Sequence, residues 1–566
     1  MNGYRIEKSK DNLDILIIND RYINSRFNPS SEANSVVYEG RNLICIFGLG
    51  FGYGLNNILK NNKESIIVVF EPVEEILTLY KKEYFSKTPF KEREILFLDK
   101  LDKEEIYSFI ENTNFFSEGR IYYYSNIGYK SLFPSLENEF YSTIKESFNI
   151  ITQNKLTESN FIPVWTKNFI FNSLKFSDSP ILKPVKIDLT DNLALIACAG
   201  PNLIKDIPII KEKREKLTIF AVDTAIKPLI KNDIFPDFVV SLDGQFYSFE
   251  DFTKYSSDET IYIFDLFSYP QAARLSKNVF FTPTKNILSE SIIEFFFTKN
   301  GIENFGITTG GTVSDYAFNF ALNLGFKNVY FSGLDLSFPY LSTHSKYSPY
   351  HERILNNQNY FETPETSMIK AISKRKIKDS KSKVESKNLI SDFVLENYGL
   401  YISNYVRIND LQNIYNSSSL GLEIEGLKNV NLKLLLDDYP SSRRIKGKTL
   451  IEKSKLFYFS KDSSAFFYDE SLNELYNFSL LLKNILDNTD FEKEDEESVK
   501  KFRGIYEANL KKFPFLKKFI LMTKIILDKK SIRDSSIIYY KHIFYKLIQS
   551  VYFTIRTIQK FKKIAV

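Results

Sequence analysis

Cysteine, histidine and tryptophan are scarce in this sequence, whose 566 residues include two Cys, three His and one Trp. Cys45 and Cys198 each lie near the end of an apolar run and close to a glycine, so we expect two buried thiols in separate strands rather than a disulfide. No Cys/His cluster has the spacing of metal ligands, and no Walker A motif occurs. The sequence therefore predicts no metal site, and phosphate binding would rest on other glycine-containing loops.

A charge excess of one sign and long apolar runs are also missing. The 75 Lys and Arg residues nearly balance the 70 Asp and Glu residues, which leaves a formal charge of +5. That excess is too small to argue for a nucleic-acid or membrane partner. No run approaches the roughly 18 apolar residues of a membrane span, and the first residues, MNGYRIEKSKDN, lack the apolar core of a signal peptide. We therefore expect a soluble, cytoplasmic protein without membrane insertion.

Hydrophobic and aromatic residues, in contrast, are abundant. They make up 43% and 15% of the chain, with 51 Phe and 35 Tyr, which is ample for packed cores. A chain of this length predicts two or three domains. We expect an α/β protein with a Rossmann-like N-terminal domain over residues 1–155 and a connector with helical content over 156–188. A central Rossmann-like domain over 189–430 and an α-helical C-terminal domain over 431–566 would follow.

The N-terminal domain carries a glycine-rich turn. An apolar strand over residues 43–47 runs into GLGFGYGL, and after a helix the next strand, residues 65–70, ends at Glu71. This layout is typical of nucleotide or S-adenosylmethionine binding, with glycines for close backbone approach and a carboxylate for ribose hydroxyls. A methyltransferase would usually carry an acidic residue just ahead of the first glycine, and here that strand ends in Cys-Ile-Phe. We therefore favour a Rossmann-like domain without a working cofactor site. In the connector we interpret Trp165 as core or interface filler.

In the central domain, polar residues repeatedly follow apolar strands. The strand LALIACA runs into a Gly-Pro-Asn turn, which we expect to leave free N–H groups and a side-chain cap facing a ligand. The strands LTIFAV and DFVVSL also end in polar residues. One such residue is commonly a helix cap, but their repetition at the carboxyl edge of a sheet indicates a binding site. The residues concerned are Gly200, Pro201, Asn202, Asp223, Thr224, Asp243 and Gln245.

The stretch from residue 306 to residue 344 carries further site candidates. Gly310 and Gly311 precede a helix predicted over 313–324, where their N–H groups would face an anion. A strand over 328–332 then delivers Asp335 to the same sheet edge. His344 follows among hydroxyl groups and tyrosines, where a histidine is a plausible general base. A structural role is the alternative for His344, and the other two histidines look structural.

The rest of the chain predicts a loop followed by helices. Residues 347–388 are polar, with a basic run at 374–378, and read either as a solvated loop or as a lid over an anionic ligand. Short strands are predicted at 414–418 and 423–425. Apolar residues at helical spacing then predict helices over 472–485, 513–527 and 537–561, which would dock on the central domain or bind a protein partner.

Several of these motifs resemble one family. GPNLIKDI, FAVDTAIKPLIKNDIFPDFVVSLDGQ, GGTVSDYAFNFALNLGFKNVYFSGLDLSF and the later His344 are similar to the motility accessory factor glycosyltransferases. Their central domain in turn resembles 6-hydroxymethylpterin pyrophosphokinase. FSGLDL followed by HSK also looks like the bacterial sialyltransferases that use CMP-sialic acid, in which the histidine is the base. The resemblance covers residues 193–426 and implies a sialyltransferase-like catalytic domain.

The resemblance implies transfer of a nonulosonic acid, of the pseudaminic or legionaminic type, from its CMP-activated form to Ser or Thr of flagellin. The reaction would be inverting and would need no metal. Carried over by position, the Gly-Pro-Asn turn, Gly310 and Gly311 would bind phosphate, and Asp223, Thr224, Asp243 and Gln245 would line the nucleotide pocket. Thr312, Ser314 and Asp335 would face the sugar, His344 would deprotonate the acceptor, and Tyr340 would contact the leaving phosphate.

The sequence departs from the family pattern at the first turn. Cys198 replaces a glycine and Asn202 replaces a serine, and we expect Asn202 still to cap the following helix. Two other classes stay open beside the transferase. One is a pterin-type diphosphokinase dependent on ATP and Mg²⁺, and the other is a non-catalytic flagellin-binding module.

Overall fold

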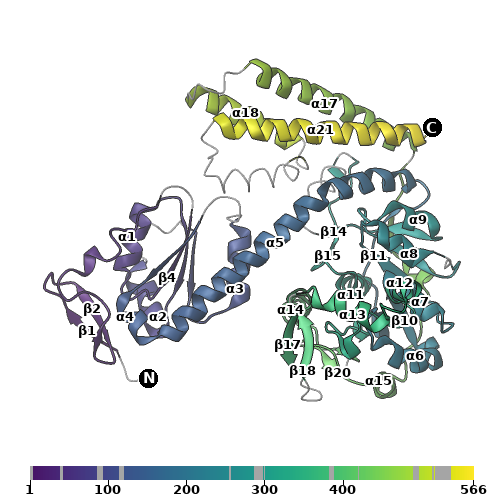
Figure 1. Ribbon diagram of the computed structural model, residues 1–566, viewed down its shortest axis with the longest axis horizontal. Coiled ribbons are helices and arrows are strands. Elements are labelled where there is room, and N and C mark those ends of the chain that lie inside the picture. Colours follow the sequence, from purple (N-terminus) through teal and green to yellow (C-terminus); the bar gives the residue numbers. More distant parts are fainter. Residues whose placement is uncertain are drawn as a thin grey trace. The chain divides into compact units, whose positions relative to one another are not determined.

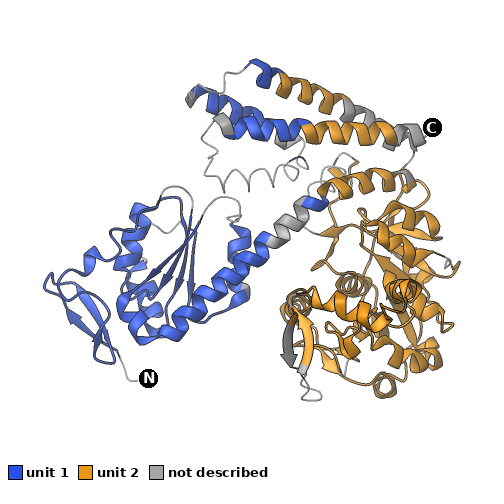
Figure 2. Ribbon diagram, viewed as in Figure 1, with its two compact units in different colours: residues 1–161, 484–509, 516–548 blue, residues 162–483, 510–515, 549–566 orange. Residues whose placement is uncertain are grey.

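Two mainly parallel sheets organise the computed structural model, each in a separate unit of the chain (Figure 2). The structure describes residues 4–38, 42–85, 94–113, 120–253, 257–285, 297–298, 300–375, 377–381, 388–417, 420–459, 461–488, 496–512, 516 and 537–565. The first unit comprises residues 1–161, 484–509 and 516–548, and the second comprises 162–483, 510–515 and 549–566. The predicted α/β class is confirmed, whereas the predicted domain boundaries stay predictions.

The first unit contains a four-stranded parallel sheet in the order β6-β5-β4-β7 (Figure 1). Its strands β4 and β5 are runs of five buried apolar residues, as expected for parallel strands covered on both faces. The elements are β4 (Leu43–Phe47), α1 (Tyr53–Asn61), β5 (Ile66–Phe70), α2 (Glu74–Glu83), β6 (Ile95–Leu98), α3 (Lys103–Asn112), β7 (Ile121–Ser125) and α4 (Ile127–Leu132). A small antiparallel sheet of β1 (Tyr4–Lys8), β2 (Asp14–Ile18) and β3 (Arg21–Tyr22) precedes them.

The second unit contains a ten-stranded sheet in the order β20-β19-β16-β9-β10-β11-β12-β13-β8-β21, parallel except for β21. From β9 the chain moves outward to β13 and then returns to β16 on the other side of β9. The order of strands therefore reverses beside β9, where ligands bind in open α/β sheets. The strands are β8 (Ile181–Lys183), β9 (Leu189–Ala197), β10 (Leu217–Val222), β11 (Phe238–Ser241), β12 (Ile261–Phe264), β13 (Val279–Phe281), β16 (Phe326–Ser332), β19 (Ile414–Asn416), β20 (Lys428–Asn429) and β21 (Lys455–Phe457).

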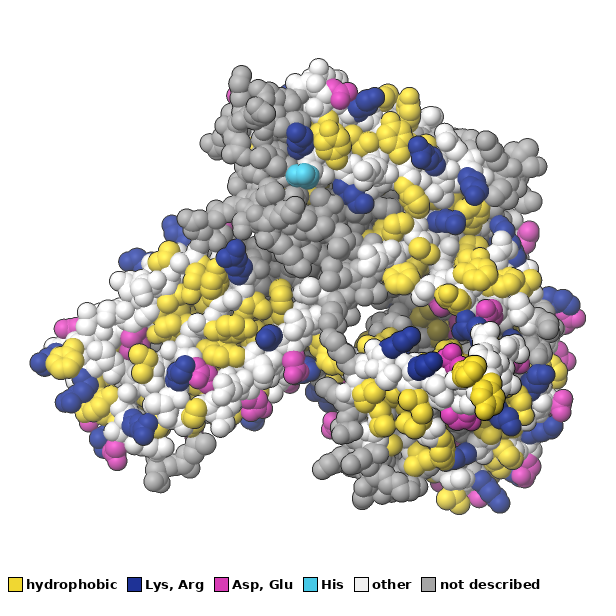
Figure 3. Space-filling view, in the orientation of Figure 1, with side chains coloured by type: hydrophobic (Ala, Val, Ile, Leu, Met, Phe, Trp, Pro, Cys, Tyr) yellow, Lys and Arg dark blue, Asp and Glu magenta, His cyan; other side chains and the backbone are white. Residues whose placement is uncertain are grey.

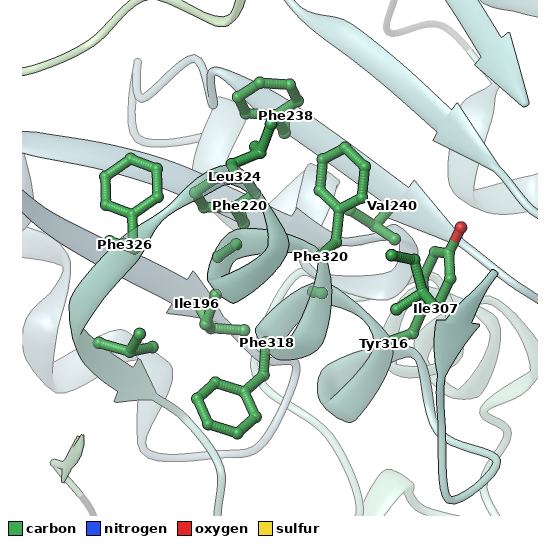
Figure 4. Close-up of a cluster of buried hydrophobic side chains, with 14 of the residues drawn as sticks. Ile196, Phe220, Phe238, Val240, Ile307, Tyr316, Phe318, Phe320, Leu324 and Phe326 are labelled. Atoms are coloured by element: carbon green, nitrogen blue, oxygen red, sulfur yellow. The ribbon is translucent and has the colours of Figure 1, made fainter. Parts of the chain in front are cut away.

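Helix α11 (Val313–Leu324) packs its apolar side on one face of this sheet. The sheet contributes alternate residues of β9 and β10, among them Ile196 and Phe220, because side chains alternate between the two faces of a strand. Figure 4 shows the aromatic part of this cluster, where the rings of Phe220 and Phe238 stack at 4.7 Å. Gly325 ends α11 with φ 112°, a left-handed conformation that favours glycine, as the sequence predicted. The core therefore anchors the strands whose carboxyl ends form the candidate site.

The segment predicted as either a solvated loop or a lid is largely regular structure. It forms α12 (Pro349–Asn357), α13 (Pro364–Ser373) and the hairpin of β17 (Ile377–Lys381) with β18 (Asn388–Asp392), followed by α14 (Phe393–Ile408). Ser348 and Thr363 cap the two short helices, each with Pro at the first helical turn. The loop alternative was wrong because these caps were not recognised, and the lid stays a prediction. The predicted strand at 423–425 is also absent from these described residues, and β20 pairs with β19 instead.

The later part of the chain is helical, with long helices α17 (Lys461–Asn488), α18 (Glu496–Lys512) and α21 (Ile537–Ala565) (Figure 1). The helices predicted over 472–485 and 537–561 lie within α17 and α21 and are confirmed. The helix predicted over 513–527 lies, apart from Leu516, outside the described residues. Basic and acidic side chains are interspersed on the face seen in Figure 3. Within the ranges that the structure describes, no helix is long and apolar enough to span a membrane.

One long helix, α5 (Pro134–Asn172), precedes the strands of the second unit. Short helices connect these strands, namely α6 (Leu203–Glu212), α7 (Ile226–Ile230), α8 (Phe249–Phe252), α9 (Pro270–Leu275), α15 (Leu432–Asp438) and α16 (Gly447–Glu452). Residues 162–172 of α5 belong to the second unit, where they contact the loops described below.

Candidate functional site at the carboxyl edge of the central sheet

The turns that follow β9 and β16 pack directly against each other. The Gly200 N–H donates to the Gly333 carbonyl oxygen over 3.0 Å. A Cβ atom on Gly200 would lie 2.3 Å from that oxygen, and Gly333 itself has φ 74°. Glycine is therefore required at both positions so that the two backbones can approach this closely. Gly200 was predicted to bind phosphate, and the structure gives it this packing role.

Asn202 and Asp335 join the same two turns. Both contacts run to the Asp335 carboxylate, from the Asn202 backbone N–H over 2.9 Å and from the Asn202 side-chain amide over 2.7 Å. Asn202 makes no side-chain capping bond to α6, so the predicted cap is wrong. Asp335, which was expected to face the sugar, is buried and holds the turn instead. The sequence did not predict these contacts because Asn202 and Asp335 lie 133 residues apart, and a local pattern cannot reveal such a pair.

The N–H groups of the Gly-Pro-Asn turn are engaged within the chain. Besides those of Gly200 and Asn202, the Leu203 N–H donates to the Gly200 carbonyl oxygen over 3.1 Å. Pro201 has no N–H to offer. The expected cradle of free N–H groups for phosphate is therefore wrong at these positions. The turn shapes the wall of the site rather than donating to an anion.

The Gly310-Gly311 turn is closed in a similar way. Thr312 and Asp315 form a capping box at the start of α11, with the Thr312 hydroxyl donating to the Asp315 carboxylate over 2.8 Å. The Gly311 N–H donates to the Thr309 hydroxyl over 3.0 Å. The Gly311 N–H and the Thr312 hydroxyl are therefore engaged within the turn and the cap, so the Gly311 N–H is not a free donor for an anion. Phosphate binding by Gly310 and a sugar contact of Thr312 stay predictions.

Ser314, the next predicted sugar-binding residue, lies near Cys198, whose thiol donates to the Ile196 carbonyl oxygen over 3.8 Å. Burial raises the pKa of this thiol to about 12, so Cys198 is a neutral packing residue. Cys45 is likewise buried and free, which confirms the expectation of two separate thiols. The start of α11 therefore lies near the end of β9, and the sugar contact of Ser314 stays a prediction.

Carboxylates gather at the carboxyl ends of β10 and β11. Asp223 is buried and accepts hydrogen bonds from the Ser241 hydroxyl over 2.7 Å and the Thr224 N–H over 2.8 Å. Burial first, and then the neighbouring charge of Asp243, raises the pKa of Asp223. Asp251 on α8 joins them, although no sequence pattern had marked this residue. Burial and then Asp223 raise its pKa well above the usual range for aspartate. The structure therefore brings Asp223, Thr224 and Asp243 together, as predicted.

Two asparagines on α5 fix the loops of this acidic edge. The Asn168 amide donates to the carbonyl oxygens of Gly244 and Phe267, over 2.8 and 3.0 Å. Asn172 donates in the same way to the carbonyl oxygens of residues 266 and 268. Trp165 packs against Gly244, where a Cβ atom would lie 3.1 Å from the indole ring. Trp165 therefore fills space, as predicted, and its ring also supports the loop that carries Asp243 and the exposed Gln245.

His344 lies beside the turn that follows β9. The neighbouring Ser345 N–H donates to the Ala199 carbonyl oxygen over 2.8 Å. The His344 Nδ1 atom lies 3.1 Å from the Thr343 hydroxyl oxygen, and the imidazole ring lies 5.2 Å from the ring of Tyr350. Burial first, and then the charges of two arginines, lower the pKa of His344 to about 4. At neutral pH the imidazole is therefore uncharged and able to accept a proton.

The segment around His344 has an unusual backbone. Four of its non-glycine residues have positive φ, namely Leu336, Tyr340, Leu341 and Tyr347. Such strain gathers at functional sites, where the surrounding structure maintains it. Tyr340 is 70% exposed, and the Lys205 ammonium on the first turn of α6 lies 5.6 Å from its ring centroid. The structure thus leaves the Tyr340 hydroxyl open beside a cation.

Two arginines near His344 were missed as site residues. They are Arg353 on α12 and Arg375 after α13, and both lower the pKa of His344. Arg375 stacks on Phe338 and pairs with the buried Asp392. Arg375 lies in the basic run that the sequence associated with an anionic ligand, whereas no sequence signal marked Arg353. The described residues contain no group of three or more His, Cys, Asp and Glu side chains arranged to hold a metal ion.

The glycine-rich turn of the first unit is filled by the chain's own side chains. The buried Glu71 carboxylate accepts the N–H groups of Leu49 over 2.9 Å and Gly50 over 3.1 Å. Cβ atoms on Gly48 and Gly52 would lie 2.3 Å from the ring of Tyr129 and 2.2 Å from that of Tyr80. These glycines therefore make room for tyrosines. This geometry supports the expectation that the turn has no working cofactor site.

The central region is similar to a known family model and to two bacterial proteins. A family model described as 6-hydroxymethylpterin diphosphokinase MptE-like matches residues 167–340. Two uncharacterized proteins of Treponema pallidum (strain Nichols) are 31% identical over 121 residues and 28% identical over 156 residues. The alignments cover 21% and 27% of this chain. The chain spans 57% of the length of the first relative and 33% of the second.

A solved structure matches almost the whole chain. It is a MAf glycosyltransferase from Magnetospirillum magneticum AMB-1, with a TM-score of 0.58, 13% identity and coverage of 99% of this chain and 93% of that chain. At this identity the match shows a shared fold. Together with the family model, it supports the resemblance to the motility accessory factor proteins that the sequence motifs indicated.

Proposed function

We propose that the chain is a glycosyltransferase that moves a nonulosonic acid, of the pseudaminic or legionaminic type, from its CMP-activated form to Ser or Thr of flagellin. The observation that carries this proposal is the position of His344, an uncharged and half-buried histidine at the switch point of a sheet whose fold matches a MAf glycosyltransferase. The reaction would take place in the cytoplasm.

His344 is the proposed general base. The acceptor hydroxyl would give its proton to Nε2, since Nδ1 lies beside the Thr343 hydroxyl. The oxygen would then attack the anomeric carbon, the bond to the phosphate oxygen would break, and CMP would leave. A single displacement of this kind inverts the anomeric configuration. The basicity of His344 would rise when an anionic donor offsets the nearby arginines, because their charge is one cause of its low pKa.

Groups on both sides of the switch point would bind the donor. Asp223 and Asp243 are hydrogen-bond acceptors, which suits ribose hydroxyls better than phosphate. Tyr340 and Lys205 offer a hydroxyl and a cation beside the first turn of α6, which suits the leaving phosphate. CMP leaves as a phosphate monoester, which hydroxyl and ammonium groups can stabilise, so the proposal requires no metal.

Calorimetric titration with CMP and with ATP, each with and without Mg²⁺, tests this proposal. We expect CMP to bind with an affinity that does not depend on Mg²⁺. Binding of ATP alone, and only with Mg²⁺, would contradict the proposal. It would instead favour a diphosphokinase, the activity named in the description of the matching family model. Absence of binding by either nucleotide would also contradict it and would favour a non-catalytic flagellin-binding protein.

A further inference from the structure

Arg353 connects the His344 loop with the acidic edge of the sheet. Its guanidinium lies 5.8 Å from the ring centroid of Tyr350, whose ring in turn lies 5.2 Å from that of His344. The guanidinium also lies 5.3 Å from the ring centroid of Tyr247, on the loop that follows β11. The same loop carries Asp243. Arg353 therefore lies near residues of both the His344 loop and the loop of the proposed nucleotide pocket.

The guanidinium of Arg353 pairs with one neighbouring carboxylate and retains further N–H donors. Its Nη1 atom lies 3.4 Å from the Glu250 carboxylate, and the side chain is 39% exposed. Glu250 is the only carboxylate that pairs with it in the described part of the chain. An arginine has five N–H donors in a rigid fork, so this contact leaves donors for a second anion. Arg375 differs, because it pairs with a buried carboxylate, that of Asp392.

The proposed reaction requires an anion at this place. In a nonulosonic acid the carboxylate is attached to the anomeric carbon itself, which is the atom that the acceptor oxygen attacks. The group that removes the acceptor proton must therefore lie close to that carboxylate. The remaining donors of Arg353, whose guanidinium is separated from the base by the ring of Tyr350, match a carboxylate, and such charge-assisted pairs are among the stronger hydrogen bonds in proteins.

We propose that Arg353 binds the carboxylate of the donor sugar and so selects acidic sugars over neutral ones. This inference rests on the proposed function, and it adds a specificity residue outside the motifs that carry the family resemblance. CMP itself lacks the sugar carboxylate, so Arg353 contributes to binding of the intact donor and not to binding of CMP. The role of Arg353 can therefore be tested separately from the proposed function.

The test compares the affinities of CMP, CMP-pseudaminic acid and CMP-legionaminic acid for the wild type and for Arg353→Gln. We expect the wild type to bind one of the CMP-sugars more tightly than CMP. In Arg353→Gln this advantage should fall by about tenfold or more, as for a lost charged hydrogen bond, while the affinity for CMP stays the same. Arg353→Lys keeps the charge but not the fork, and should retain part of the advantage.

Arg407→Gln, on the last turn of α14, serves as the matched control for loss of one arginine charge, and the melting temperature reports folding of each variant. Failure of the wild type to bind CMP would contradict the proposed function itself. An Arg353→Gln protein that binds CMP and keeps the full advantage of the CMP-sugar would overturn only the role of Arg353. A wild type that binds the CMP-sugars no more tightly than CMP would overturn it as well.

Discussion

At the scale of single residues, the strongest functional signal is the electrostatic state of His344. Burial and two nearby arginines lower its pKa to about 4, so the ring stays uncharged over the whole range near neutrality. An uncharged imidazole forms no ion pair with a phosphate, but it keeps a nitrogen that can accept a proton. A pKa this far below neutrality also makes the ring a weak base, so the proposed role of base requires the rise in basicity that an anionic donor would bring.

His344→Ala should reduce turnover by about 10²- to 10⁴-fold, which is the usual contribution of a general base. The affinity for CMP should stay within about twofold, because the base contacts the acceptor rather than the nucleotide. Calorimetry and a transfer assay with flagellin measure the two effects. His542→Ala, an exposed histidine on α21, is the control and should retain full turnover. Normal turnover in His344→Ala would refute the assignment of the base.

Residue roles could be predicted from the sequence only where local pattern decides them. The pattern of polar residues after apolar strands found Asp223 and Asp243, because strand ends can be read from the sequence itself. It failed for Asn202, whose partner Asp335 lies 133 residues away. Arg353 and Asp251 carry no local signal, since their position near the site comes from tertiary packing. The sequence therefore placed several polar residues at the carboxyl edge of the sheet correctly, but it did not reveal the long-range contacts that engage Asn202 and Asp335.

At the scale of elements, α11 depends on its capping box rather than on a ligand. The Thr312 hydroxyl accepts from the Asp315 N–H over 3.1 Å and also donates to the Asp315 carboxylate, so both of its functions are used within the helix terminus. Because α11 covers the central sheet, a weaker helix terminus should lower the stability of the whole second unit.

Thr312→Ala should therefore lower the free energy of unfolding by about 1 kcal/mol, as loss of an N-cap does. Thr312→Ser retains the hydroxyl and should stay close to the wild type. Urea denaturation measures both variants, and CMP-sugar affinity measured in parallel should be equal in all three proteins. A drop in affinity without a change in stability would instead indicate the sugar contact that the sequence resemblance suggested.

The glycine-rich turn of the first unit leads to a separate prediction at this scale. The Glu71 carboxylate occupies the N–H groups that a cofactor would use, and Tyr80 and Tyr129 fill the space next to the glycines. We expect S-adenosylmethionine and NAD at millimolar concentration to leave the melting temperature unchanged. A ligand bound well below that concentration would raise it through linkage. A clear upward shift would show that these side chains can move aside.

Secondary structure was predicted best where the apolar period is strong. The central strands are short, buried and apolar, and α11 has a regular helical stripe, so their positions follow from local pattern alone. The helices α12 and α13 were missed because each buries a single residue or little more on a narrow face. Their beginnings are set by Ser348 and Thr363, caps that a search for apolar periodicity overlooks. Weakly amphipathic helices near a site are thus the hardest elements to predict.

At the scale of the whole molecule, a shared fold accompanies a very different sequence. The match to a MAf glycosyltransferase extends over 99% of the chain at only 13% identity. A fold that persists at this level supports many functions, so activity must be argued from the site. In this chain the N–H groups of the Gly-Pro-Asn turn and of Gly311, which were expected to bind phosphate, are engaged within the chain. The donor would then be held mainly by side chains, which are the groups that the variants above change.

The acidic edge of the sheet should also make the stability of the whole chain depend on pH. Burial and then Asp223 raise the pKa of Asp251, so the folded chain binds this proton more tightly than the unfolded chain, in which an aspartate titrates near pH 4 (about 3.9). A raised pKa contributes stability that is fully present below the unfolded value and is lost as the pH rises toward the folded one. Asp251→Asn removes that loss, since the amide does not titrate. We therefore expect the melting temperature of Asp251→Asn, relative to the wild type, to rise steadily between pH 5 and pH 8, about the range over which most proteins are studied. Asp233→Asn changes an aspartate whose side chain is 80% exposed, and its melting temperature should vary with pH as that of the wild type does. Parallel curves for Asp251→Asn as well would mean that Asp251 titrates in the folded protein as it does in the unfolded one, with the charge of Lys227 offsetting the effects of burial and Asp223.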